Sequence, residues 1–323
     1  MKSPSIISTF LFLLLCILPK KAECRGNFDG GVDIKLEFSL GVRVNTDEGN
    51  SNQENRMLPE NMPTLFATFK RLVGGTFKMG SPPEENDRNH EDETQVEVTI
   101  SPFAIMVKEL TQIQWFRRTG TNPSEYKEKH HCPENHQVLP GIDGDVELCP
   151  NHPAEGMSHN DAMVYIRKEN ESLQLFNCQG TPFDPKGCLR LPSEAEWEFA
   201  ARGGEESAYY FGNDPFKLSY HAWYSMNSEG TTHPVGERFP NQYGIYDIYG
   251  NVGEWTADNY RQSLLAGENP FYKIKNPEDE DYWYVYRGGG YSSSAWELRS
   301  ATRASAAVGH RFYSVGMRLV ETL

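Results

Sequence analysis

Residues 190–202 read Arg190-Leu-Pro-Ser-Glu-Ala-Glu-Trp-Glu-Phe-Ala-Ala-Arg202, and this stretch decides the kind of fold to expect. Ser193 stands three residues before Glu196, the capping-box arrangement in which each side chain accepts a hydrogen bond from the other residue's backbone N–H. Gly203 follows directly and suits the left-handed turn that ends many helices. The sequence therefore predicts a short helix that begins after Ser193 and ends near Gly203.

The same signature occurs twice more, in Thr111-Gln-Ile-Gln114 and in Ser158-His-Asn-Asp161. We expect helices to begin there and to end near Gly120 and Asn170. Elsewhere glycine and proline recur among short apolar segments, a composition typical of irregular loops between small strands. The pattern predicts a domain with few short helices and strands and much irregular loop.

The balance of charge argues against a nucleic-acid partner. The 323 residues include 45 acidic and 31 basic residues, a formal net charge of −14. Such a surface repels phosphate backbones, and no basic cluster offsets the repulsion. If an N-terminal leader is removed, about 300 residues remain. They are enough to bury a full hydrophobic core, which favours one large domain.

Residues 1–24 have the features of a secretory signal peptide: a basic start, an apolar run over 6–18 and a small-x-small site, Ala22-Glu-Cys24. The apolar run is too short to span a membrane. A lipoprotein acylated at Cys24 is the rival interpretation, but a glutamate stands where that signal needs a small residue. We therefore expect a periplasmic or secreted protein without a transmembrane segment.

Residues 25–62 divide into two parts. Over 31–42 apolar residues alternate with others, which is the period of a β-strand. Residues 45–56 are polar and bury too little apolar surface to order themselves. We predict a strand-forming arm, a flexible linker and a main domain over 63–323. The arm would add a strand to its own domain, the simpler interpretation, or to the sheet of a partner.

Four cysteines lie in the predicted main domain, and an even number in an exported chain indicates disulfides. Four cysteines allow three pairings. We favour the pairing of neighbours, Cys132 with Cys149 and Cys178 with Cys188, which would tie down loops of about 18 and 11 residues. A zinc site is the alternative for the first pair, because a histidine follows each of its cysteines after two or three residues.

Several short motifs follow one another in a fixed order over residues 73–81, 108–111, 157–162, 190–202, 243–255, 287–290 and 316–318. Each motif is weak alone, but the ordered set is specific. It resembles the formylglycine-generating enzyme, or sulfatase-modifying factor, family. The resemblance implies a compact α+β fold, similar to C-type lectins, with little regular structure.

The resemblance also implies a structural calcium site in Asp247-Ile-Tyr-Gly-Asn-Val-Gly-Glu254. Matched residue by residue, Asp247 and Glu254 would supply carboxylate oxygens, and Gly250 and Val252 would supply backbone carbonyls. Calcium prefers such hard oxygen ligands. The alternative is a turn that holds no ion.

In this family two cysteines bind copper(I), and one of them engages a substrate cysteine that dioxygen oxidises to an aldehyde. The matching positions of this chain hold Ser293 and Leu298. A serine hydroxyl is neither soft nor ionised near neutral pH, and leucine has no ligand atom, so we expect no copper. Gly290 and Gly253 also replace larger family residues, a serine and a tryptophan.

The remaining pocket would be small and polar, formed by Gly253, Gly290, Tyr291, Ser292, Ser293, Arg299 and Arg303. The spacing ties no histidine to a serine, so no residue is singled out as catalytic. The two arginines would recognise an anion or, in the simpler interpretation, form ion pairs that hold the loop.

Two function classes follow. In the first, the chain is an exported accessory protein without oxidase chemistry that binds a protein, a peptide or a small molecule. In the second, it is a periplasmic modifying enzyme that uses other residues in protein or natural-product maturation. A histidine or carboxylate within hydrogen-bond reach of the serines would favour the enzyme.

Overall fold

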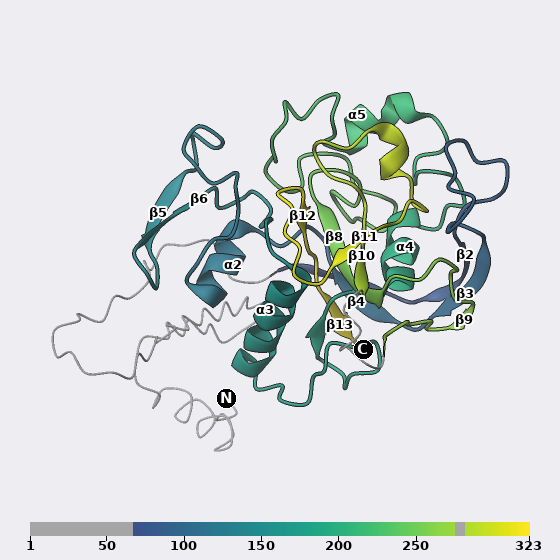
Figure 1. The fold of residues 1–323 in the computed structure, drawn as a ribbon, viewed down its shortest axis with the longest axis horizontal. Helices are drawn as coiled ribbons and strands as arrows, with labels where there is room; N and C mark the ends of the chain where they lie inside the picture. Colours follow the sequence, from purple (N-terminus) through teal and green to yellow (C-terminus); the bar gives the residue numbers. More distant parts are fainter. Residues whose placement is uncertain (1–66, 275–281) are drawn as a thin grey trace, which may run out of the picture. The chain divides into compact units, whose positions relative to one another are not determined.

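The computed structural model describes residues 67–274 and 282–323. The predicted signal peptide, the arm and the boundary at residue 63 lie outside these residues and stay predictions. Within the described ranges, short strands form small sheets, helices are few and loops connect them (Figure 1). The expected α+β architecture is confirmed.

Three helices begin directly after the residue predicted to cap them: α2 (Gln112–Thr119), α3 (His159–Ser172) and α4 (Glu194–Arg202). In each, both hydrogen bonds of the capping box are present. α2 and α4 end at Gly120 and Gly203, both with a left-handed backbone, as predicted. α3 runs two residues past Asn170, because the buried Asn170 side chain bonds both backbone groups of Leu189 and does not end the helix.

Three shorter helical turns were not predicted: η1 (Pro215–Lys217), α5 (Leu218–His221) and η2 (Ala295–Leu298). The last of them has the same sequence signature as the longer helices. At its start the backbone N–H and the hydroxyl of Ser294 both donate to the Glu297 carboxylate at 2.7 Å. The pattern was therefore present in the sequence, although only one 3-10 turn follows it.

The first four-stranded sheet has the order β1 (Phe69–Leu72), β4 (Phe103–Met106), β13 (Val320–Thr322) and β7 (Leu189–Arg190). The second has the order β11 (Ala304–Ala307), β10 (Trp283–Arg287), β8 (Gly253–Asn259) and β12 (Val315–Gly316). A three-stranded sheet has the order β2 (Gly75–Met79), β3 (Val96–Ile100) and β9 (Gly267–Glu268), and β5 (Gln137–Pro140) pairs with β6 (Asp145–Leu148). Most pairs are antiparallel, but β12 runs parallel to β8 and β9 to β3. The last strand thus joins strands from the start of the domain.

Helix α4 is buried along its whole length, and all nine of its residues are inside the protein. It contacts β2 and β3 on one side and β8 and β10 on the other (Figure 1). Trp197, fully buried, belongs to the larger hydrophobic core. The helix therefore joins the two sheets and brings its charged side chains into the interior.

Each of the three glutamates of α4 has a buried arginine partner. Glu196 pairs with Arg190 at 2.6 Å, on the strand before the helix. Glu198 pairs with Arg202 at 2.8 Å and with Arg287 at 2.5 Å. Glu194, described below, is paired in the same way. Removing one partner of such a pair leaves an uncompensated charge inside the protein.

Both predicted disulfides are formed. Cys132 bonds to Cys149 and Cys178 bonds to Cys188, each with Cα atoms 5.6 Å apart. Because both sulfurs of the first pair are used in the bond, the alternative zinc site is excluded. Disulfides of this kind persist in oxidising compartments outside the cytosol.

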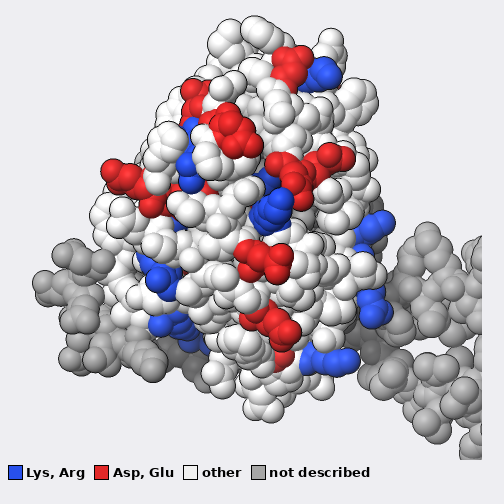
Figure 2. Space-filling model, turned by 90° about the vertical axis from the view of Figure 1, so that its right-hand side faces the viewer, with Lys and Arg blue, Asp and Glu red and all other residues white. Residues whose placement is uncertain are grey.

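No helix in the described ranges is both long enough and apolar enough to cross a membrane. On the face that lies to the right in Figure 1, acidic and basic side chains are interspersed (Figure 2). The predicted lack of a nucleic-acid partner stays a prediction from the net charge.

Replacing Glu198 with glutamine should lower the free energy of unfolding by about 3–5 kcal/mol, because Arg202 and Arg287 lose a buried anionic partner. Urea denaturation measures the change. Glu206→Gln is the matched control, since Glu206 pairs with Lys78 at 3.6 Å on the surface. That substitution should change stability by less than about 1 kcal/mol. Equal effects of the two substitutions would contradict the importance of the buried pairs.

Candidate functional site

The loop between β10 and η2 brings together the two positions matched to the family's cysteines. Gly289 has a left-handed backbone, with φ 63°. A Cβ added to Gly289 would lie 3.0 Å from Leu298 Cδ1 and 3.1 Å from Ser293 Oγ. Ser293 and Leu298 therefore meet at one glycine, and the matched positions form one site.

Neither position offers a soft metal ligand. Leu298 is fully buried in the larger core. Ser293 Oγ accepts a hydrogen bond from the backbone N–H of Gly290 at 3.1 Å. In the described part of the chain, no histidine or carboxylate bonds to the hydroxyl of Ser292 or Ser293. Nucleophilic catalysis by a serine requires such a base in contact with its hydroxyl.

The space around Gly253 and Gly290 is filled by neighbouring residues. A Cβ on Gly253 would lie 3.2 Å from the Tyr286 ring. One on Gly290 would lie 2.9 Å from the carbonyl oxygen of Ser314 and 3.1 Å from its Cβ. The larger family side chains would not fit unless these neighbours moved. Without side chains at these two glycines, the neighbouring residues Tyr286 and Ser314 pack close to the backbone.

The side chains of Arg299 and Arg303, the two arginines expected at the pocket, are engaged in buried ion pairs. Arg299 is buried and pairs with Glu85 at 2.6 Å and Glu93 at 2.8 Å. Arg303 is buried and pairs with Glu194 at 2.6 Å. The simpler interpretation, ion pairs that hold the loop, is the one the structure shows.

Tyr291 is a buried residue of this loop, and its hydroxyl meets a second phenol. The hydroxyl of Tyr126 donates to that of Tyr291 at 2.6 Å, and the two rings pack edge to face. Burial raises the pKa of Tyr291 above its ordinary value. The loop is also held by the backbone N–H of Ser225, which donates to the carbonyl of Ser293 at 3.0 Å.

Three apolar side chains are exposed on segments that touch this loop: Met226 (80%), Trp296 (49%) and Tyr313 (55%). Met226 follows the residue that bonds Ser293, and Trp296 lies in η2. Tyr313 precedes Ser314, whose carbonyl oxygen would lie 2.9 Å from a Cβ on Gly290 in the loop. Exposed apolar side chains on neighbouring segments are typical of interaction surfaces when they form one patch. We call these three residues the apolar rim.

Glu155 positions Tyr126 and was not predicted. Its Oε1 accepts from the backbone N–H groups of Glu125 at 2.8 Å and Tyr126 at 3.1 Å. Its Oε2 is buried and has no partner among the described residues. Burial raises the pKa of Glu155 to about 8. The only sequence signal was an acid among small and apolar neighbours in Pro153-Ala-Glu-Gly-Met157.

The predicted calcium turn is tight. Asp247, Gly250 and Asn251 all have left-handed backbones, which aspartate, glycine and asparagine tolerate best. Asp247 Oδ2 accepts from the backbone N–H of Gly236 at 2.5 Å. Its Oδ1 is buried without a partner among the described residues. One oxygen aimed into the interior is thus free to bind a cation.

The turn holds more negative than positive charge. Glu109, Asp247 and Glu254 are all buried there, and Arg318 is the arginine among them. Burial raises the pKa of Asp247 to about 6. Burial, with the neighbouring carboxylates Asp247 and Glu254, raises the pKa of Glu109. A bound cation or protonation of the carboxyls would balance the excess.

Two of these carboxylates already have hydrogen-bond partners. Glu254 accepts from Arg318 at 2.6 Å and from the indole N–H of Trp197 at 2.7 Å. Glu109 accepts from the backbone N–H of Val252 at 3.0 Å and from the Asn251 side chain at 2.7 Å. Glu109 therefore shapes the turn from a distant segment, which the sequence did not indicate. The residues fit a cation best at Asp247, and an ion at Glu254 would share its oxygens with Arg318.

Residues 56–323 match the family of sulfatase-modifying factor enzyme 1-like domains. The chain belongs to this family. The resemblance read from the ordered motifs is thereby confirmed. Membership alone leaves the chemistry open, because the site at Ser293 and Leu298 lacks the cysteines.

Relatives within the family carry different names. The chain is 32% identical over 250 residues to the chaperone protein LppX of Paenibacillus barcinonensis, covering 69% of this chain and 78% of LppX. It is 33% identical over 227 residues to the formylglycine-generating enzyme of Mycobacterium tuberculosis, covering 58% of this chain and 73% of that enzyme. It is 42% identical over 234 residues to the inactive C-alpha-formylglycine-generating enzyme 2 of Mus musculus, covering 59% of this chain and 68% of the mouse protein.

Solved structures share the fold. Treponema denticola variable protein 1 has a TM-score of 0.64 and 24% identity, over 80% of this chain and 95% of that one. PvdO from Pseudomonas aeruginosa has a TM-score of 0.62 and 26% identity, over 79% of this chain and 94% of PvdO. The fold predicted from the motifs is confirmed, while its relation to C-type lectins stays a prediction.

Glu155→Gln should make the protein less sensitive to alkaline pH. Because the folded pKa of Glu155, about 8, lies above the ordinary value of 4.5, the folded state holds a proton that the unfolded state releases. The stability that this proton contributes is fully present below pH 4.5 and is lost as the pH rises through 8. It amounts to about 1.4 kcal/mol for each pKa unit between the folded and the unfolded state. Glutamine keeps the acceptor for Glu125 and Tyr126 and does not titrate.

Urea denaturation of both proteins at pH 5, 7 and 9 measures the effect. The variant should gain stability relative to the wild type as the pH rises. Parallel pH profiles for the two proteins would show that Glu155 is ionised in the folded state and would contradict the prediction.

Proposed function

We propose that this family member is an exported accessory protein that binds another polypeptide at the loop around Ser293, without formylglycine chemistry. The observation that carries the proposal is the meeting of Ser293 and Leu298 at Gly289, where neither residue offers a thiolate. The thiolate is the nucleophile and the soft-metal ligand, so without it copper(I) has nothing to bind. Two relatives named as a chaperone and as an inactive enzyme support a role without catalysis.

A polypeptide is favoured over a small molecule because of the shape of the site. Ser314 and Tyr286 fill the space at Gly290 and Gly253, so the site offers a surface. The three side chains of the apolar rim are exposed on segments next to this surface. Aromatic residues and methionine are the side chains enriched where proteins bind one another.

Export is supported by two independent features. The two disulfides need an oxidising compartment such as the periplasm or the extracellular space. The predicted signal peptide over residues 1–24 gives the route. A lipoprotein anchored at Cys24 remains the alternative to a cleaved leader.

A second candidate function is a modifying enzyme that uses other groups. The hydrogen-bonded phenols of Tyr126 and Tyr291 favour it, because they lie beside exposed Ser292 and near the buried acid Glu155. Paired phenols can hold or transfer a proton. The absence of a histidine or carboxylate at the hydroxyls of Ser292 and Ser293, within the described ranges, makes this the weaker candidate.

Trp296→Ser and Met226→Ser should each weaken binding of an unfolded polypeptide by about fivefold or more, as expected for anchor residues. Fluorescence anisotropy with a labelled, reduced and carboxymethylated polypeptide measures the affinity. Phe176→Ser is the matched control, because Phe176 is also apolar and 75% exposed but lies in the loop after α3. An equal loss with the control, or no binding by the wild type, would refute the proposed surface.

The enzymatic alternative is tested with the same protein. Incubated with copper(I) and a sulfatase-type cysteine peptide, it should form no aldehyde by mass spectrometry. Aldehyde above a control without protein would show that oxidase chemistry survives without the cysteines.

We also propose that the turn at residues 247–254 holds a structural calcium ion. Asp247 and Glu254 would supply carboxylate oxygens, and Gly250 and Val252 backbone carbonyls. Such an ion would neutralise buried charge and stabilise the turn, and it would take no part in chemistry. The free Oδ1 of Asp247 and the surplus of carboxylates support this proposal.

Chelation should therefore lower the melting temperature by a few degrees, because an ion that binds the folded state stabilises it by about 2.7 kcal/mol at a hundredfold excess over Kd. Asp247→Asn should abolish most of this response, whereas Asp143→Asn on an exposed loop should not. Glu254→Gln would be a poor probe, because it also breaks the buried pair with Arg318. An unchanged melting temperature and no co-purifying calcium would leave a turn without an ion.

A further inference from the structure

The two disulfides of the protein differ in how deeply their cysteines are buried. Cys132 and Cys149 are 7% and 0% exposed, so both lie inside the domain. Cys188 is likewise buried, at 1%, but Cys178 is partly exposed. A disulfide exchanges with a thiol only where the thiolate reaches one of its sulfurs. The second disulfide is therefore the more open to a thiol, and Cys178 is the cysteine that the thiol would reach.

A carboxylate lies beside this second disulfide. Asp184 is 7% exposed, and one of its oxygens and the sulfurs of Cys178 and Cys188 all lie within 4.8 Å of one another. Across residues 67–274 and 282–323, no carboxylate oxygen is that near to both sulfurs of Cys132 and Cys149. A carboxylate at this distance can move a proton to or from a sulfur directly or through one water molecule.

Asp184 is fixed by the loop that the disulfide closes. Its Oδ2 accepts from the backbone N–H groups of Gln179 and Gly180, each at 2.7 Å. Its Oδ1 accepts from the hydroxyl of Thr181 at 2.9 Å. Each oxygen can accept a further bond, because a carboxylate has about four acceptor sites. The loop thus positions a carboxylate that can still receive a proton.

Cys188 is anchored separately, to strand β13. Its carbonyl accepts from the backbone N–H of Thr322 at 3.1 Å, and the N–H of Gly187 donates to the carbonyl of Thr322 at 2.8 Å. These bonds and those of Asp184 do not pass through a sulfur. The two cysteines should therefore stay close after the bond between them opens, which allows the bond to form again.

We propose that Cys178–Cys188 is an exchangeable disulfide that oxidises two thiols of a substrate. One substrate thiolate attacks the sulfur of Cys178 and bonds to it. The sulfur of Cys188 leaves with the electron pair of the broken bond and takes up a proton that Asp184 relays. A second substrate thiolate attacks the substrate sulfur of this mixed disulfide, and Cys178 leaves as a thiolate. The substrate loses two electrons, and the protein's disulfide gains them.

One round of this reaction needs no other oxidant, because the protein's own disulfide accepts the electrons. A further round needs a second disulfide, such as oxidised glutathione, to restore the bond. In that reverse direction Cys188 gives its proton to Asp184 as its sulfur closes the bond. The substrate thiols belong to cysteines of a polypeptide or to small thiols such as glutathione. The reaction does not depend on the binding surface proposed around Ser293.

Reaction of the folded protein with reduced glutathione shows which bond exchanges. After free thiols are trapped with iodoacetamide, peptide mapping should find glutathione on Cys178 and the label on Cys188. Cys132 and Cys149 should stay joined and should open at least tenfold more slowly. A peptide with one cysteine distinguishes the substrates, since a rate tenfold above that of glutathione identifies a polypeptide and an equal rate identifies a small thiol.

Asp184→Asn tests the proton transfer, because asparagine keeps an acceptor oxygen for the loop but cannot take a proton. With glutathione attached to Cys178, closure of the bond by Cys188 should be at least tenfold slower than in the wild type at about pH 6.5. The difference should shrink towards about pH 9, where a cysteine with the ordinary pKa of about 8.5 ionises without a base. Asp143→Asn, on an exposed loop, is the matched control and should close at the wild-type rate.

Thermal melts establish that each variant is folded. Opening of Cys132–Cys149 at least as fast as Cys178–Cys188, or glutathione on Cys188 in place of Cys178, would overturn the proposal. Closure by Asp184→Asn as fast as by the wild type at about pH 6.5 would overturn it as well. If Asp184→Asn does not fold, the order in which glutathione opens the two disulfides of the wild type still decides.

Discussion

The glutamates of helix α4 have to be neutralised inside the protein, and the rest of the domain is arranged around that requirement. Three carboxylates on a nine-residue buried helix would be strongly unfavourable without cationic partners. The partners come from widely separated segments, among them Arg190 before the helix and Arg287 at the end of β10. The helix therefore fixes where several strands and loops must pass, as well as filling the core with Trp197.

This constraint also positions the candidate site. Arg287 is held by Glu194 and Glu198, and the loop with Gly289 and Ser293 begins directly after it. The same scaffold would serve an oxidase or a binding protein, because the ion pairs hold the loop whatever side chains it presents. What differs is the chemistry of the side chains, and here leucine and serine have replaced soft ligands. Function in such a fold depends on the residues of the site.

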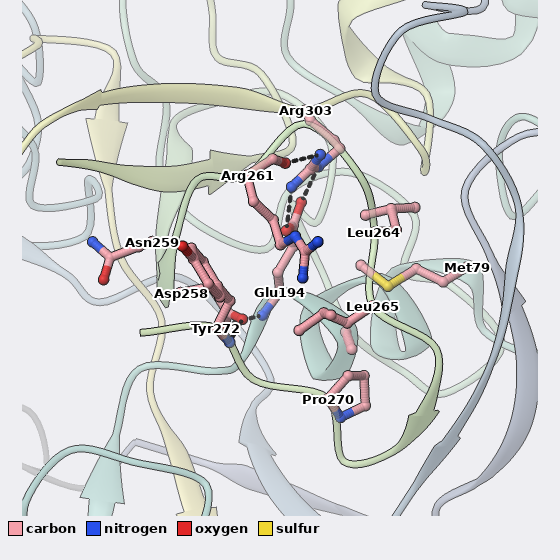
Figure 3. A pocket seen from close by; sticks show the side chains of 11 residues that line it. Met79, Glu194, Asp258, Asn259, Arg261, Leu264, Leu265, Pro270, Tyr272 and Arg303 are labelled. Atoms are coloured by element: carbon pink, nitrogen blue, oxygen red, sulfur yellow. Dashed lines mark hydrogen bonds and ion pairs between the residues drawn. The ribbon is translucent and has the colours of Figure 1, made fainter. Parts of the chain in front are cut away.

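Charge is balanced differently in the three buried regions. At α4 each carboxylate has an arginine. At the turn of Asp247 the carboxylates outnumber Arg318, which is why a cation is expected there. At the end of β8 the two signs occur in equal number, because Glu194 and Asp258 lie on the same wall of a small hollow as Arg261 and Arg303 (Figure 3). Where a buried cluster of ionisable side chains has an excess of one charge, a group of the opposite charge would stabilise it.

The sequence alone determined the features that depend on neighbours within a few residues or on residue identity. The three longer helices and their starts followed from capping boxes, because those hydrogen bonds join residues three apart. The loss of the copper ligands followed from the residue types at two positions, and the disulfide pairing joined cysteines close in sequence. The family followed from the order of its motifs.

Contacts between residues far apart in the sequence depend on the packing of the whole domain. Arg299 was placed in the pocket from its nearness to Ser293 in sequence, but it pairs with Glu85 and Glu93, which lie more than 200 residues earlier. Glu155, which holds the loop of Tyr126, likewise had no signal in sequence spacing. The reason is physical, since a buried charge pairs with whatever opposite charge the chain's path brings to it. Local hydrogen bonds can be read from spacing, whereas partners across the core depend on how every strand and loop is packed.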